Sequence, residues 1–305
     1  MTVQGPLPSD RLGRTLMHEH VLVDFIGADK IQPGRYDREQ VFDKVLPYLK
    51  ELVAAGCQTL VECTPAFLGR DPDLLLRLSR ASGLHILTNT GIYGAAADKY
   101  IPPFAYRETA EELAQRWIRE AENGIPPSGI KPGFMKIGVD SGPLSTIDAK
   151  LVKAAGLTHQ RTGLIIASHT GDGVAAMAQL ALLKDLGVPL SAFIWVHAQN
   201  ESDPALHKKA AGLGAWVEFD GIASETVSQS VRLVMEMKRA GFLERVLISQ
   251  DAGWYHVGET DGGALRGYTT LFFEFLPALR QAGATSEDVE TLLVDNPREA
   301  LTPTK

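Results

Sequence analysis

Short apolar runs recur along the chain, and each run ends in a polar or glycine-containing stretch. Runs of this length, rich in β-branched and aromatic residues, predict buried strands. Eight such runs occupy Thr15–Val21, Thr59–Cys63, His85–Thr90, Phe134–Val139, Leu164–Ser168, Phe193–Val196, Ala215–Phe219 and Val246–Ser249.

Most of these runs are separated by segments whose apolar residues lie three and four positions apart, the spacing of one helix face. The predicted helices are Glu39–Ala55, Asp73–Ser82, Glu108–Glu122, Asp148–Thr162, Gly173–Leu186, Asp203–Ala211, Ser224–Ala240 and Leu265–Ala282. Strands that alternate with helices predict an α/β fold with parallel pairing through helical crossovers.

Two α/β architectures fit this alternation, a doubly wound open sheet and a closed (β/α)8 TIM barrel. The count of eight strands favours the barrel. No GxGxxG or GxxxxGK loop follows the first strand, which disfavours a nucleotide-binding open sheet. Because no low-complexity linker marks a second domain, we predict a single barrel domain over residues 1–305.

Composition narrows the class of partner. The net charge of −7 argues against nucleic acid or an anionic membrane surface, and no apolar run reaches the ~18 residues of a membrane span. Residues 1–13 lack the features of a signal peptide. Cys57 and Cys63 are expected to be free, buried thiols, as in a reducing compartment. These features predict a cytoplasmic protein whose partner is a small-molecule substrate.

The first strand carries the clearest chemical motif, Met17-His18-Glu19-His20-Val21. Side chains alternate along a strand, so His18 and His20 share one face and Glu19 lies on the other. Two imidazoles placed in this way can hold one metal ion, zinc or a first-row neighbour. The alternative is a half-buried strand with polar residues near its end.

Further polar residues close later strands, namely Lys136, His169, His197 and Asp251. Alone, each histidine fits a core position and the aspartate fits a helix N-cap. In a barrel, however, the carboxyl ends of the strands meet at one mouth, where catalytic residues lie. Together with His18 and His20, these residues predict a site for two metal ions.

Lys136 is the unusual member of this set, because lysine is rarely buried in an apolar strand without a partner. Burial disfavours the charged ammonium. A neutral amine can add carbon dioxide to form a carbamate, whose two oxygens can bridge two metal ions. We therefore expect Lys136 to be N6-carboxylated.

The sequence resembles the phosphotriesterase branch of the amidohydrolase superfamily, which includes the phosphotriesterase-like lactonases. The resemblance runs from Thr2 to Pro297. It is carried by His18-Glu19-His20, Gly69-Arg70-Asp71, Thr90-Gly91-Ile92-Tyr93, Lys136, Ser168-His169-Thr170, His197 and Asp251.

The resemblance implies a role for each ligand. His18, His20 and Asp251 would bind the more buried metal, and His169 and His197 the more exposed one. Carboxylated Lys136 and a hydroxide would bridge the two ions. Zinc is the expected metal, with manganese, cobalt or iron as alternatives, and a homodimer is the expected assembly.

The implied reaction is attack of the bridging hydroxide on a lactone or another carboxylic ester, with Asp251 as the base and Tyr93 orienting the substrate. The alternatives are hydrolysis of a phosphotriester or phosphodiester at the same site, or a non-catalytic barrel that binds a small molecule.

The chain also departs from the family pattern. Gly221 follows Asp220 where phosphotriesterases carry a histidine of a proton relay and several lactonases carry an arginine. After His197, Ala198-Gln199-Asn200 lacks the aspartate that relatives place at its third position. These departures count against fast organophosphate hydrolysis and leave the acyl-homoserine-lactone assignment open.

Two aromatic-rich loops, Gly94–Arg107 and Ala252–Gly267, follow strands at the predicted active end. They can form an apolar substrate wall or pack on the barrel rim. Asp220 is either a substrate contact or a strand-end cap, and His256 either a proton shuttle or a solvated loop histidine. The candidate substrate contacts are Tyr93, Asp220, Trp254, Tyr255 and His256.

Overall fold

The strands of the computed structural model, which describes residues 1–302, all run parallel. Residues 303–305 of the predicted domain lie outside the described residues. The strands are β1 (Thr15–Val23), β2 (Thr59–Glu62), β3 (His85–Leu87), β4 (Asn89–Thr90), β5 (Phe134–Val139), β6 (Ile166–Thr170), β7 (Phe193–Val196), β8 (Trp216–Phe219), β9 (Val246–Ile248) and β10 (Gly253–His256).

Two junctions close these strands into a barrel. Only Thr88 separates β3 from β4, so the predicted run His85–Thr90 is one strand with a short break. At the other junction the backbone N–H of Asp251 donates to the carbonyl of His18 at 3.0 Å, and that of His20 donates to Ala252 at 2.9 Å. Taking β3 with β4 and β9 with β10, the described chain forms the eight-stranded parallel barrel that the sequence predicts.

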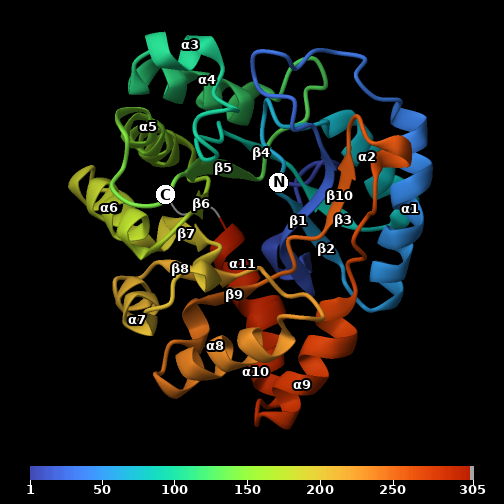
Figure 1. The fold of residues 1–305 in the computed structure, drawn as a ribbon, viewed down its shortest axis with the longest axis vertical. Helices are drawn as coiled ribbons and strands as arrows, with labels where there is room; N and C mark the ends of the chain where they lie inside the picture. The colour runs from blue at the N-terminus through green and yellow to red at the C-terminus, as the bar shows by residue number, and fades with distance from the viewer. Residues whose placement is uncertain (303–305) are drawn as a thin grey trace.

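Most of the helices surround the strands on the outside of the barrel (Figure 1), and the last helix packs its Ala300 and Leu301 against residues of the barrel interior. They are α1 (Arg38–Ala54), α2 (Pro72–Ser82), α3 (Pro103–Arg107), α4 (Ala110–Asn123), α5 (Thr146–Thr162), α6 (Gly173–Asp185), α7 (Pro204–Gly212), α8 (Val227–Arg239), α9 (Leu276–Gln281), α10 (Ser286–Glu290) and α11 (Asn296–Leu301). Local sequence starts several of them: Thr109 and Glu112 form a capping box at α4, as Ser145 and Asp148 do at α5.

The core has two main parts. A large cluster packs the apolar faces of the helices against the outer face of the strands. A smaller cluster takes residues from separate strands, among them Met17, Val61, Phe134 and Trp216, and fills the barrel interior. Since the interior is packed solid below, polar side chains have room only at the mouth, where the strands end.

Two sequence predictions are wrong in this part of the chain. The loop expected over Ala252–Gly267 contains β10, which pairs with β1 because β9 ends at Ile248 and leaves that edge of β1 free. The helix expected from Leu265 begins only at Leu271, with a π-helical turn before α9. Arg266 cannot join it, because its backbone exchanges two hydrogen bonds with Gly253.

Two composition-based expectations can be compared with the described residues. Cys57 and Cys63 are both free and buried, as predicted. Among residues 1–302, no helix has the length and apolar character needed to cross a bilayer.

The closing junction generates a stability prediction at Gly253. Its φ is +95°, and a Cβ there would lie 1.8 Å from the His20 carbonyl oxygen. Gly258 has nearly the same φ, +94°, with nothing within 4 Å. Gly258→Ala should therefore lower the free energy of unfolding by about 1 kcal/mol from backbone strain, and Gly253→Ala by about 1–3 kcal/mol more from overpacking. Urea unfolding of both variants measures the difference, and equal losses would contradict this account of the junction.

Candidate metal centre

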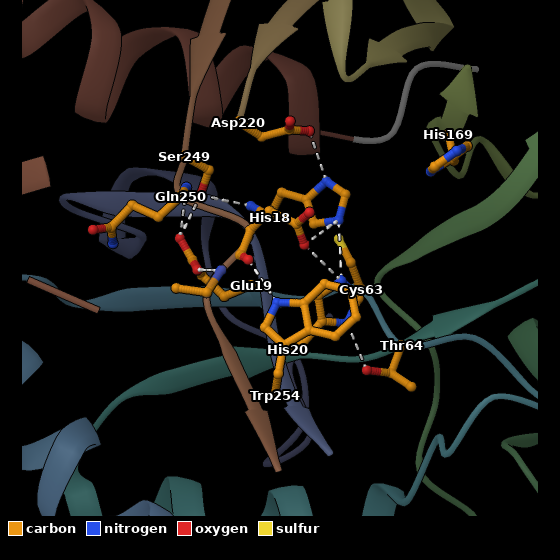
Figure 2. Close-up of polar contacts among 12 residues, drawn as sticks. His18, Glu19, His20, Cys63, Thr64, His169, Asp220, Ser249, Gln250 and Trp254 are labelled. Carbon is orange, nitrogen blue, oxygen red and sulfur yellow. Dashed lines mark hydrogen bonds and ion pairs between the residues drawn. The ribbon is translucent and has the colours of Figure 1, made fainter. Parts of the chain in front are cut away.

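The predicted ligands from β1, β5 and the end of β9 meet at the mouth of the barrel. His18 and His20 project to the same side of β1, with their Nε2 atoms 3.3 Å apart (Figure 2). Lys136 Nζ lies 3.3 Å from His18 Nε2. Asp251 Oδ1 lies 3.1 Å from His20 Nε2 and 3.7 Å from His18 Nε2.

The remaining two histidines stand on the neighbouring strands. His169 lies near the end of β6 and His197 directly follows β7, with their ring centroids 4.4 Å apart. The His197 ring is in turn 5.0 Å from that of His18. The structure thus brings all six predicted ligands to one cavity of about 170 Å³, with His18, His20, Lys136, His169, His197 and Asp251 in its wall.

The donor set fits divalent transition metal ions. Imidazole nitrogens and a carboxylate are ligands that zinc and its neighbours accept. The Oδ1 atom of Asp251 is buried and, although His20 Nε2 lies 3.1 Å away, it accepts no hydrogen bond of good geometry within residues 1–302. A buried polar atom without a partner is costly, and a cation beside it would remove that cost.

Burial tunes the protonation of these ligands. It lowers the pKa of His20 to about 4, and with the nearby charge of His197 it lowers the pKa of His169 well below its usual value. Both rings are therefore neutral near pH 7, the form that binds metal. Burial and Lys136 also act to lower the pKa of His18, but Asp220 and Glu218 outweigh them and raise it to about 9.

Asp220, at the end of β8, contacts two of the predicted ligands, His197 and His18. Its Oδ1 accepts a hydrogen bond from His197 Nδ1 at 2.7 Å, and its Oδ2 lies 3.0 Å from His18 Nδ1. Burial acts to raise the pKa of Asp220, but His197 and His18 outweigh it and hold that pKa well below its usual value. Asp220 thus faces the histidines, a position different from the expected substrate contact. The sequence offered one signal for this contact: Asp220 follows β8, the strand after β7, and His197 follows β7.

The space beside Gly221 is filled by Gln199. A Cβ on Gly221 would lie 2.8 Å from Gln199 Nε2. The same Nε2 donates to Asp220 Oδ1 at 2.7 Å, and the backbone N–H of Asp220 donates to Gln199 Oε1 at 3.2 Å. Gln199 therefore occupies the room that a relay histidine or arginine at position 221 would need.

Two of the predicted ligands adopt the left-handed backbone region, which sequence reasoning missed. The φ angles of His197 and Asp251 are +62° and +51°. For residues other than glycine this conformation costs about 1–3 kcal/mol and is found where the surroundings enforce it, often at functional sites. After His197, the buried His207 bonds the Ala198 carbonyl at 2.7 Å and secures that turn.

The candidate substrate contacts divide into two groups. Tyr93 and Trp254 line the cavity, with the Tyr93 hydroxyl 3.1 Å from His169 Nδ1 and the Trp254 ring 4.5 Å from that of His20. Tyr255 is a correction, because it alternates to the opposite face of β10 and packs in the outer core.

His256 is not part of the described cavity lining. It stacks on Trp254 and lies 3.7 Å from Glu259. Tyr100, in the loop expected over Gly94–Arg107, also lines the cavity. Sequence reasoning missed two apolar wall residues, Phe25 and Leu68, because they come from loops without a chemical motif.

Comparisons with known proteins point to one family. The sequence model described as the phosphotriesterase family matches residues 1–301. The "Phosphotriesterase homology protein" of Escherichia coli strain K12 is 30% identical over 294 residues, which cover 95% of this chain and 98% of that protein.

Two solved structures share the fold. A mutant of an organophosphorus hydrolase from Deinococcus radiodurans superposes with a TM-score of 0.89 at 27% identity, covering 99% of this chain and 96% of the other. A protein whose structure was reported for engineering organophosphate hydrolysis from "a weak promiscuous lactonase template" has a TM-score of 0.88 at 27% identity, covering 99% of both chains.

The Asp220 contacts generate a second prediction. Asp220→Asn keeps the side-chain size but replaces one acceptor by a donor, so one histidine loses its support. Zinc affinity should fall about 10–100-fold, measured as bound zinc in equilibrium dialysis against a zinc buffer. The control is Asp140→Asn, whose carboxylate follows β5 and accepts from Ala96 and Ala97. Equal affinities in the two variants would contradict the orienting role.

Proposed function

The chain belongs to the phosphotriesterase family, a family of hydrolases, and from this premise we propose that it is a binuclear metal-dependent hydrolase that opens a lactone or another carboxylic ester. The observation that carries the proposal is the set of six ligand side chains around one cavity. The lactonase origin of one solved relative supports a carboxylic ester in particular. Gly221 counts against fast phosphotriester hydrolysis, because the relay histidine of the phosphotriesterases is absent there.

The ligand set divides by exposure. His18, His20 and Asp251 would hold the inner metal, and His169 and His197 the outer one, with carboxylated Lys136 between them. Zinc is the metal we propose, with manganese, cobalt or iron as alternatives. Bound here, the two ions would supply an activated water and polarise the oxygen of the scissile group.

The chain's own groups then have distinct tasks. Asp251 accepts the proton of the attacking water and delivers it to the oxygen of the leaving alcohol as the acyl C–O bond breaks. Tyr93 presents its hydroxyl beside His169, where it can orient the substrate. Trp254, Phe25 and Tyr100 form an apolar wall that limits the access of bulk water.

Phosphotriester hydrolysis at the same site is the alternative. It is favoured by the solved relative named as an organophosphorus hydrolase. It is disfavoured here by Gly221 and Gln199, which leave Asp251 without the relay of the phosphotriesterases. A non-catalytic binding barrel would not need all six ligands at one cavity.

A substrate panel tests the proposed function. γ- and δ-lactones and an aryl phosphotriester are compared by kcat/KM on the same preparation. We expect the lactones to be the better substrates, with activity lost on chelation and restored by zinc, manganese or cobalt. A higher kcat/KM for the phosphotriester would favour the alternative. Hydrolysis that survives complete metal removal would overturn the metal-dependent mechanism.

The base role of Asp251 generates a further prediction. Asp251→Asn removes the proton acceptor and should lower kcat by about 100-fold or more, with a much smaller change in KM. Asp261→Asn is the control, because Asp261 lies after β10 and is outside the described cavity lining. Steady-state kinetics on the preferred lactone measures both. A near-normal kcat in Asp251→Asn would show that another group takes the proton.

A further inference from the structure

Glu19 is the one residue of the His-Glu-His motif that the proposed reaction does not use. It is fully buried, and it points away from His18 and His20 towards Ser249 and Gln250 (Figure 2). A buried carboxylate without a task is costly, because its desolvation has to be offset by hydrogen bonds. The partners of Glu19 therefore indicate what it does.

Both oxygens of Glu19 accept hydrogen bonds from the segment that follows β9. Oε1 accepts from the Ser249 hydroxyl at 2.8 Å and from the Gln250 backbone N–H at 3.0 Å. Oε2 accepts from the Ala252 backbone N–H at 2.7 Å. Ser249 Oγ in turn accepts from the backbone N–H of His18 at 2.9 Å.

Asp251 is the residue enclosed by these contacts. The peptide N–H groups of the residues before and after it both donate to Glu19, and its own N–H donates to the His18 carbonyl at 3.0 Å. Asp251 has a φ of +51°, a conformation that an aspartate holds only when its surroundings enforce it. In that conformation its carboxylate turns towards His18 and His20.

We propose that Glu19 is a positioning residue for Asp251: its carboxylate holds the backbone N–H groups of Gln250 and Ala252, the residues on either side of Asp251, and so supports the left-handed turn that presents the Asp251 carboxylate to the inner metal. We call Glu19 with Ser249, Gln250 and Ala252 the Glu19 clamp. The inference rests on the proposed function, in which Asp251 is a metal ligand.

The clamp requires a side chain of glutamate length with two acceptor oxygens. Three donors reach these two oxygens, the Ser249 hydroxyl and the backbone N–H groups of Gln250 and Ala252. Glutamine has a single acceptor oxygen, and its NH2 group would face an N–H donor on one side. Aspartate is one methylene shorter and cannot span the same gap.

Zinc release tests the clamp in the full-length, zinc-loaded protein. Glu19→Gln should release the inner zinc to a chromogenic chelator about 10–100-fold faster than wild type. The control is Glu62→Gln, because Glu62 is an equally buried carboxylate on β2 that accepts from the Val21 N–H at 3.2 Å and is not bonded to Ser249, Gln250 or Ala252. If Glu19 only joined the strands, both variants would lose stability in urea and keep the wild-type release rate.

A double-mutant cycle shows whether Glu19 acts through Asp251. In an Asp251→Asn background the further change Glu19→Gln should accelerate release far less than it does alone, because the residue being positioned is already altered. Additive effects of the two changes on the release rate would overturn the proposal.

A milder variant covers the case in which Glu19→Gln does not fold. Ser249→Ala removes one of the donors to Glu19 and should accelerate release in the same direction by a smaller factor. The clamp alone would be overturned if Ser249→Ala released zinc at the wild-type rate. It would also be overturned if Glu19→Gln released zinc no faster than Glu62→Gln. A wild-type protein that takes up no zinc would overturn the proposed function, and the clamp with it.

Discussion

Hydrogen bonds between β1 and the segment after β9 bring His18 and His20 close to Asp251. His18 and Asp251 are far apart in sequence, yet backbone and side-chain bonds join their strands at several points. The same bonds close the barrel. Fold and site are therefore one structural problem here: a chain that fails to close this junction also fails to bring Asp251 to the histidines.

The second constraint is the charge gathered in a buried space. Asp220, Asp251, Lys136 and several histidines share the interior of the barrel mouth, where isolated charges are costly. Asp220 resolves part of this cost by bonding His197 and contacting His18. Part of the desolvation cost remains at atoms such as Asp251 Oδ1, which accepts no hydrogen bond of good geometry among the described residues. A site of this kind is stabilised by the cations that it would hold, so metal binding and folding are expected to be linked.

The sequence predicted the barrel and the six residues that the structure brings to one cavity, because both depend on local pattern. Apolar runs predict the strands. A histidine, lysine or aspartate at the end of a run can be recognised from its position in that run alone. It did not predict β10, the orienting role of Asp220 or the left-handed turns at His197 and Asp251. Each of these depends on a partner far along the chain, such as β1 for β10, and no local spacing encodes that partner. Tyr255 illustrates the limit. It was expected in a loop that lines the cavity, but it lies on β10, where its side chain points to the outer core.

The packing of Gln199 against Gly221 constrains how this site can evolve. A side chain introduced at position 221 alone would collide with the carboxamide and disturb Asp220, which Gln199 also supports. A change at position 199 alone would open a gap and remove that support. The two positions are therefore coupled through Asp220: the effect of a change at one depends on the residue at the other.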